Sequence, residues 1–87
     1  MSKKIKIEEK LRDFNRAITW DELVTMFEGM GFQLHQSGGS HVFFRHPETQ
    51  VKLRIAKPHG SQKDLKGYQR HEAIVAIDNH MSLYNEK

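Results

Sequence analysis

Histidine is the residue type in this sequence that is best suited to chemistry near neutral pH, and five of the six histidines lie between residues 31 and 71. An unperturbed imidazole has a pKa of about 6.5, so it can take up or release a proton under these conditions. The sequence contains no cysteine for a thiolate site, and its carboxylates lack the spacing of a metal-binding helix. The residue types therefore favour proton transfer by imidazole, and we expect neither a metal nor another cofactor.

His41 is the histidine with the most informative setting, because it follows the turn Gly38-Gly39-Ser40. Backbone N–H groups in such a turn have little side-chain obstruction and could receive a phosphate oxygen. Taken alone, a histidine at the start of a strand is more often an exposed polar residue without a task. RNA needs no metal for cleavage, since its 2′-hydroxyl can attack the neighbouring phosphate once a general base removes the proton. His41 is the best-placed candidate for that base, because Gly39-Ser40-His41 lies within a His-rich, basic segment.

A sheet face with cations and an aromatic side chain is expected around His41. Apolar and polar residues alternate after Phe32, so the apolar set should face the core and the other set should face outward. On the outer face Phe43 could stack on a base, and cations could hold phosphates. Alternatively, the amino-terminal helix could cover Phe43 and make it part of the core. The expected outer face presents Gln33, His35, His41, Phe43, Arg45, Lys52 and Arg54.

Positive charge is concentrated in the same part of the chain. Residues 31 to 71 contain seven Lys or Arg against two Asp or Glu, a net charge of +5, whereas the whole chain carries +3. This favours an anionic partner, with nucleic acid first, although a solvated basic face without a ligand would look similar. The loop after the third predicted strand adds Lys57 and His59, and His59 could protonate the leaving group. The predicted RNA-binding residues are Gly39, Ser40, Phe43, Arg45, Lys52, Arg54, Lys57 and His59.

A helix is predicted on the amino-terminal side of the strands. Thr19 can cap it while Glu22 binds the Thr19 N–H in return, and Gly31 can end it in the left-handed conformation. Its apolar residues at helical spacing are Trp20, Leu23, Val24, Phe27 and Met30.

Two-residue alternation then predicts three strands with one buried face. Turns at residues 37–40 and 47–50 would join them into an antiparallel meander. The apolar residues of the successive strands are Phe32 and Leu34, then Val42 and Phe44, then Val51, Leu53 and Ile55.

A second long helix is expected after the strands, and a short amphipathic helix is expected before residue 19, with Ile7, Leu11 and Phe14 on one face. The fold class is therefore α+β: a helix, a three-stranded antiparallel sheet and a helix, with an extra short N-terminal helix. Both long helices should cover the apolar face of the sheet. The apolar side of the last helix comprises Ala73, Ile74, Ile77, Met81 and Tyr84.

The length of 87 residues leaves room for one domain, which we place at residues 1–87. The longest apolar run, Ala73 to Ile77, is far shorter than the roughly 20 residues that cross a bilayer. The Lys-rich start also lacks the apolar stretch of a signal peptide. We therefore expect a soluble, cytoplasmic protein that does not contact a membrane.

Three segments share a family pattern: Trp20 to Phe32 (WDELVTMFEGMGF), Gly38 to Pro47 (GGSHVFFRHP), and Pro58-His59 ahead of Lys66-Gly67. Their order and spacing resemble those of the HicA toxins of bacterial toxin-antitoxin pairs. The resemblance extends over roughly residues 19–77, and its centre is the Gly-Ser-His-x-x-Phe pattern after a helix that ends in Gly-Phe.

The resemblance implies a fold like that of the double-stranded-RNA-binding domain and metal-independent cleavage of mRNA, with His41 as the catalytic residue. It also implies a HicB-type antitoxin that covers the active face. The protein could form a homo-oligomer, or a hetero-oligomer with the antitoxin. The chain departs from the usual compact toxin in residues 1–18, in a longer loop at 57–66 and in the tail at 78–87. These additions could serve dimerisation or antitoxin docking, and they leave the role of His59 open.

Two other functions agree with the same residues. One is a non-catalytic RNA-binding module that uses the same basic sheet face. The other is a protein-interaction domain whose sheet face binds only a peptide or an antitoxin. A neighbouring gene for a small acidic protein would favour the toxin over both.

Overall fold

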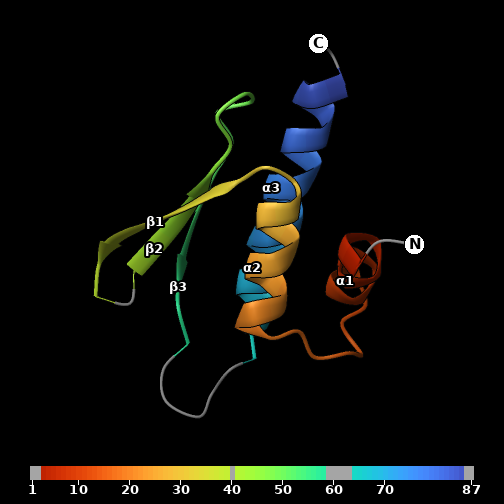
Figure 1. Ribbon diagram of the computed structural model, residues 1–87. Helices are drawn as coiled ribbons and strands as arrows, with labels where there is room; N and C mark the ends of the chain where they lie inside the picture. The colour runs from red at the N-terminus through yellow and green to blue at the C-terminus, as the bar shows by residue number, and fades with distance from the viewer. Residues whose placement is uncertain (1–2, 40, 59–63, 86–87) are drawn as a thin grey trace.

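The computed structural model describes residues 3–39, 41–58 and 64–85. Within them the order of elements is the predicted one, a short helix, a helix, three strands and a helix (Figure 1). The α+β fold class is therefore confirmed. The elements are α1 (Lys3–Arg12), α2 (Trp20–Gly29), β1 (Gln33–Gly38), β2 (His41–Arg45), β3 (Lys52–Ala56) and α3 (Gly67–Asn85).

Both ends of α2 follow from local sequence signals. The Glu22 N–H donates to the Thr19 hydroxyl while the Thr19 N–H donates to the Glu22 carboxylate, so the predicted capping box is present. At the other end Gly31 adopts a φ of 96°, as predicted, and the next N–H donates back to Phe27 O at 3.0 Å. A side chain at Gly31 would be strained, because its Cβ would also lie 2.8 Å from Nε2 of His46.

The sheet is an antiparallel meander in the order β1-β2-β3, which leaves β1 and β3 as its edges. β1 continues to Gly38 and carries a register shift between Gln36 and Gly38, so the predicted turn at residues 37–40 begins later than expected. Val51, predicted to lie in the third strand, precedes β3, which begins at Lys52, although the Val51 carbonyl still accepts from the His46 N–H across the hairpin. Ser40, which was predicted to bind RNA, lies outside the described residues.

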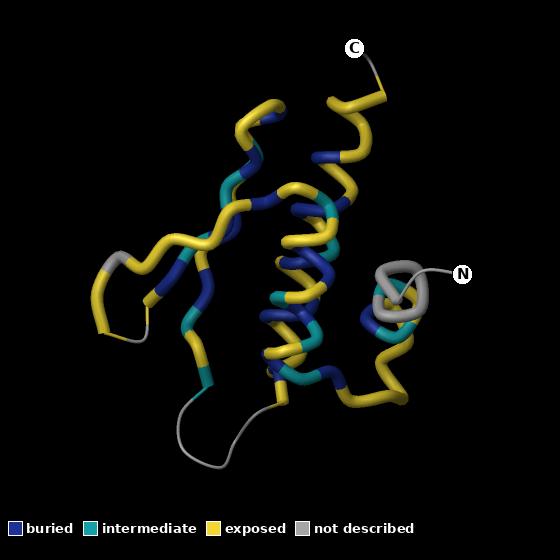
Figure 2. Tube along the Cα trace, viewed as in Figure 1, coloured by how far each residue is buried: buried dark blue, intermediate teal, exposed yellow. Residues whose placement is uncertain are grey.

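Both long helices lie on one face of the sheet, as predicted, and α1 lies against α2 and α3 (Figure 1). The buried residues of Figure 2 run along the inner sides of these elements. Three aromatic rings join α2 to the sheet, with ring centroids 4.8 Å apart for Phe27 and Phe44 and 6.0 Å apart for Trp20 and Phe44. Aromatic pairs at these separations add to the stabilisation from burial itself.

Some residues that were predicted to be buried are exposed. Leu34 is 38% exposed although it faces the same way as the fully buried Phe44. Phe14 is 55% exposed, because α1 ends at Arg12 and Phe14 lies in the following turn. Met81 and Tyr84 are also exposed, since they follow the last buried residue of α3, His80. Ile7, which was predicted to lie on the apolar face of the first helix, is not among the side chains that the structure describes.

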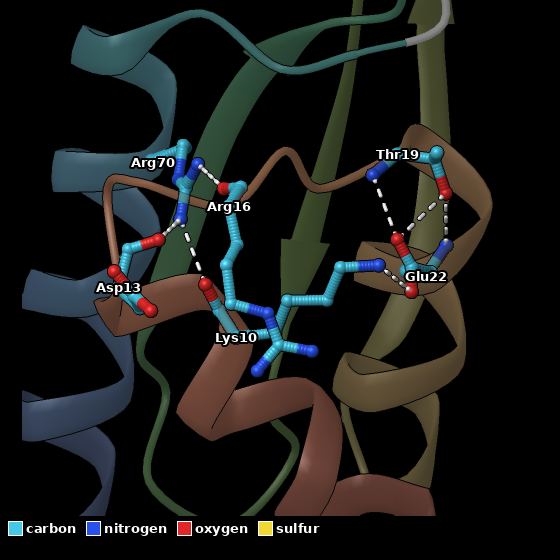
Figure 3. A network of polar contacts seen from close by, with 6 residues as sticks. All are labelled: Lys10, Asp13, Arg16, Thr19, Glu22 and Arg70. Carbon is cyan, nitrogen blue, oxygen red and sulfur yellow. Dashed lines mark hydrogen bonds and ion pairs between the residues drawn. The ribbon is translucent and has the colours of Figure 1, made fainter.

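Polar contacts attach α1 firmly to the rest of the molecule (Figure 3). The buried Arg70 guanidinium of α3 donates to four backbone carbonyls at the end of α1 and in the segment after it, those of Lys10, Leu11, Asp13 and Arg16. A cation at the carboxyl end of a helix also interacts favourably with the helix dipole.

Ion pairs and apolar burial strengthen this attachment. Lys10 pairs with Glu22 at 2.7 Å, and Arg12 pairs with Asp78 of α3 at 2.7 Å. Leu11 and Ile18 are fully buried in the common core. Residues 3–18 therefore help to build the core in this chain. No helix among the described residues is long and apolar enough to cross a membrane.

Candidate active site and nucleic-acid interface

The sheet face that the helices leave uncovered carries the predicted outer residues in three rows. Residues paired across an antiparallel ladder point to the same face, so the register places them directly. The rows are Gln33, Arg45 and Lys52, then His35, Phe43 and Arg54, then Gly38, His41 and Ala56.

His41 begins β2 and is exposed at the end of the sheet where the first turn lies. Its ladder partner on β1 is Gly38, and a Cβ added at Gly38 or Gly39 would meet no atom within 4 Å. Glycine backbone without side chains therefore lies beside the imidazole, and a phosphate could approach this backbone closely.

A hollow of about 360 Å³ brings four predicted site residues together. It is open to solvent on the uncovered face and combines an imidazole, an aromatic ring and two cations from β2 and β3. The three strands contain no Asp or Glu, so no carboxylate on them offsets this positive charge. An anion is therefore the ligand that the hollow favours. Its lining residues are His41, Val42, Phe43, Lys52, Arg54 and Ile55.

Phe43 is partly buried by its neighbours on the same face. The ring of His35 stacks on it with a centroid distance of 5.0 Å and an interplanar angle of 20°, and Lys52 Nζ lies 4.2 Å from its centroid. Because β1 and β3 flank β2, these two groups approach Phe43 from opposite sides. The alternative in which α1 covers Phe43 is wrong, because α1 packs against α2 and α3 (Figure 1).

The remaining predicted residues are less closely grouped. Arg45 is on the same face, and its guanidinium donates to Oε1 of Gln50. Lys57 follows β3 and lines a different hollow of about 310 Å³, together with Lys66 and Tyr68. His59, the predicted proton donor, lies outside the described residues, as does Ser40.

A pair of buried histidines was not predicted from the sequence. The rings of His46 and His80 lie with centroids 4.2 Å apart, and His80 Nδ1 is 3.0 Å from the hydroxyl of Thr49. His46 Nδ1 accepts from the Glu48 N–H at 3.1 Å, so its Nε2 carries the proton and donates to Met30 O at 3.1 Å. Both ring nitrogens of His46 are thus engaged in holding the turn after β2 against the end of α2.

Burial is the main cause that lowers the pKa of His80 below its usual value of 6.5. The neighbouring His46 lowers it further, and Glu48 opposes both effects. A histidine that is kept neutral inside the core has a structural role here. Within the part of the chain that is described, no three His, Cys, Asp or Glu side chains gather in a way that could hold a metal ion.

Comparison with known proteins gives one family. A family model described as "HicA toxin of bacterial toxin-antitoxin" matches residues 20–77. No curated protein and no solved structure matches the chain. The matched span begins with α2, includes all residues of the hollow and ends within α3, so α1 and the last turns of α3 lie outside it.

Proposed function

The chain belongs to the HicA toxin family of bacterial toxin-antitoxin systems, and on this basis we propose that it is an endoribonuclease that cleaves mRNA without a metal. The observation that carries the proposal is the hollow in which His41 lies with Phe43, Lys52 and Arg54. Such a hollow supplies a base and two cations for a phosphate on one open surface.

In the proposed reaction His41 removes the proton from the 2′-hydroxyl of the RNA. The 2′-oxygen then attacks the adjacent phosphorus, and the bond from phosphorus to the 5′-oxygen of the next nucleotide breaks. Lys52 and Arg54 stabilise the negative charge that develops on the phosphate oxygens. The products are a 2′,3′-cyclic phosphate and a 5′-hydroxyl, and no step uses a metal.

A toxin of this kind has an antitoxin as its partner, and we place a HicB-type antitoxin on the same sheet face. The cations Arg45, Lys52 and Arg54 occupy strands without carboxylates, so an acidic protein surface would complement this face. Binding there would exclude RNA from the hollow. Inhibition by the antitoxin and cleavage of RNA would then take place at the same surface.

The test replaces His41 by alanine and measures cleavage of RNA, RNA affinity and growth of expressing cells. Loss of a general base should lower the cleavage rate by about 10² to 10⁴-fold, while the fold and the affinity remain nearly unchanged. His71→Ala is the matched control, because His71 is an exposed histidine of α3 outside the hollow. The parent should produce 2′,3′-cyclic ends and should cleave in excess chelator.

Two results would contradict the proposal. A His41→Ala protein that cleaves RNA as fast as the parent would remove the assigned base. A parent that binds RNA tightly but neither cleaves it nor slows growth would identify a non-catalytic RNA-binding module on the same face.

A further inference from the structure

His35 is the second imidazole on the uncovered face. It pairs with Phe43 across the β1–β2 ladder, and His41 lies two residues before Phe43 on β2. His35 and His41 are thus diagonal neighbours on one face, a relation in which Cα atoms are about 7 to 8 Å apart and longer side chains can reach a common ligand.

The surface between these two imidazoles carries no side chain at Gly38. The ladder partner of His41 on β1 is Gly38, whose missing side chain leaves space on the side of β1 where His35 lies. A phosphate between the two imidazoles, on the Gly38 side of Phe43, would have one of them on each side. Cleavage by the 2′-hydroxyl needs groups on opposite sides of the phosphorus, because the attacking and leaving oxygens are in line.

The orientation of His35 is also restrained. Its ring stacks nearly parallel on Phe43, at 5.0 Å and 20°, which limits rotation of the imidazole plane. Lys52 on the far side of Phe43 keeps that ring in place in turn. A group that is held before the substrate arrives loses less freedom in the reaction.

We propose that His35 is the general acid of the reaction, a role that rests on the proposed function. As His41 takes the proton from the 2′-hydroxyl and the 2′-oxygen bonds to phosphorus, the imidazolium of His35 gives its proton to the departing 5′-oxygen. The two imidazoles end with exchanged protonation states, and proton exchange with water restores both. Of the side-chain types on this face, imidazole is the one whose ordinary pKa lies near neutrality, whereas lysine and arginine retain their protons.

The experiment compares two RNA oligonucleotides after the cleavage position of the parent has been mapped. One has the natural 5′-oxygen at that position, and the other has a bridging sulfur there, which leaves as a thiolate without needing a proton. His35→Ala should lose about 10² to 10⁴-fold of its rate on the natural RNA and regain a rate close to that of the parent on the sulfur RNA. His41→Ala should be slow on both.

The dependence of the cleavage rate on pH separates this role from a structural one. The rate of the parent should fall at both acid and alkaline pH, and His35→Ala should lose the alkaline fall, because that fall reports deprotonation of the acid. Gln33→Ala is the control, since Gln33 lies on the same strand and face. Gln33→Ala should keep the parent's cleavage rates on both RNAs and the parent's dependence of rate on pH.

The outcomes distinguish this inference from the function on which it rests. If His35→Ala cleaves natural RNA as fast as the parent, or is equally slow on both RNAs, His35 is not the acid. The proposed function survives either result as long as His41→Ala is inactive. A parent without cleavage overturns the proposed function, and the role of His35 with it.

Discussion

At the scale of single residues, His41 and His46 lie near each other in the sequence and differ in what surrounds their rings. His46 is buried, and both of its ring nitrogens contact backbone groups, so it holds a turn in place. His41 is exposed beside glycine and two cations, in a hollow that favours an anion. Environment, rather than residue type, thus separates the histidine proposed for catalysis from a structural one.

The cations of the hollow lead to a prediction about salt. Arg54→Ala should weaken binding to RNAs of any sequence, because a lost phosphate contact releases one counterion fewer. The slope of log affinity against log salt should become shallower by about 0.7, and by about 1.4 when Lys52→Ala is added. Fluorescence anisotropy of labelled single-stranded RNA at a series of salt concentrations measures this slope.

Arg16→Ala is the matched control, because Arg16 is an exposed arginine on the segment between α1 and α2. It should leave the slope near that of the parent. An unchanged slope in Arg54→Ala, or an equal change in Arg16→Ala, would place the phosphate contacts elsewhere.

At the scale of elements, the carboxyl-terminal part of α3 is held against the turn between β2 and β3. The main contact there is the pair of His80 with His46 and Thr49 (Figure 1 shows α3 beside this hairpin). Beyond His80 the helix continues with exposed residues. The histidine pair is therefore the last buried contact along α3.

This contact predicts acid sensitivity. Burial lowers the pKa of His80 in the folded protein below 6.5, so at pH values between the two pKa values the unfolded chain binds more protons than the folded one. Stability is then full above about pH 6.5 and falls as the pH decreases below it, until the folded pKa is passed. Urea unfolding at a series of pH values measures the effect.

His80→Gln should be less sensitive to acid than the parent between pH 7.5 and roughly 5, since glutamine can still bond to Thr49 but does not titrate. His71→Ala should keep the parent's acid sensitivity, because His71 is exposed. If His80→Gln loses stability with acid as steeply as the parent, the sensitivity has another origin.

At the scale of the whole molecule, Arg70 connects α3 to the end of α1 and to the segment that follows it. It is only 5% exposed and donates to carbonyls that are up to 60 positions away in the sequence. Figure 3 shows the guanidinium between α3 and the segment that follows α1. Hydrogen bonds from a charged donor are stronger than neutral ones, and their loss leaves the acceptors unpaired.

Arg70→Met should therefore lower the free energy of unfolding by about 3 kcal/mol. Arg12→Met is the control, because Arg12 forms exposed ion pairs with Glu8 and Asp78, and such pairs contribute at most about 1 kcal/mol. Urea unfolding monitored by circular dichroism compares the two. Equal losses in both variants would show that Arg70 does not fasten α1 to the core.

Local sequence signals were sufficient for the order of elements, the capping box at Thr19, the left-handed Gly31 and the outward row around Phe43. Each depends on residues a few positions apart, through helical period, strand alternation or a cap, so the chain carries the information without its tertiary contacts. The glycine-rich turn before His41 belongs to the same class of signal.

Other features were decided only when distant segments met. Thr49 and His80 are 31 positions apart, and Arg70 reaches carbonyls 54 to 60 positions away. Helical or strand periodicity therefore could not predict that these polar groups are buried. Leu34 is 38% exposed although its ladder partner Phe44 is fully buried, and strand alternation alone does not distinguish the two. Burial and partners are properties of the folded assembly of elements, since a side chain's surroundings come mostly from residues remote in sequence.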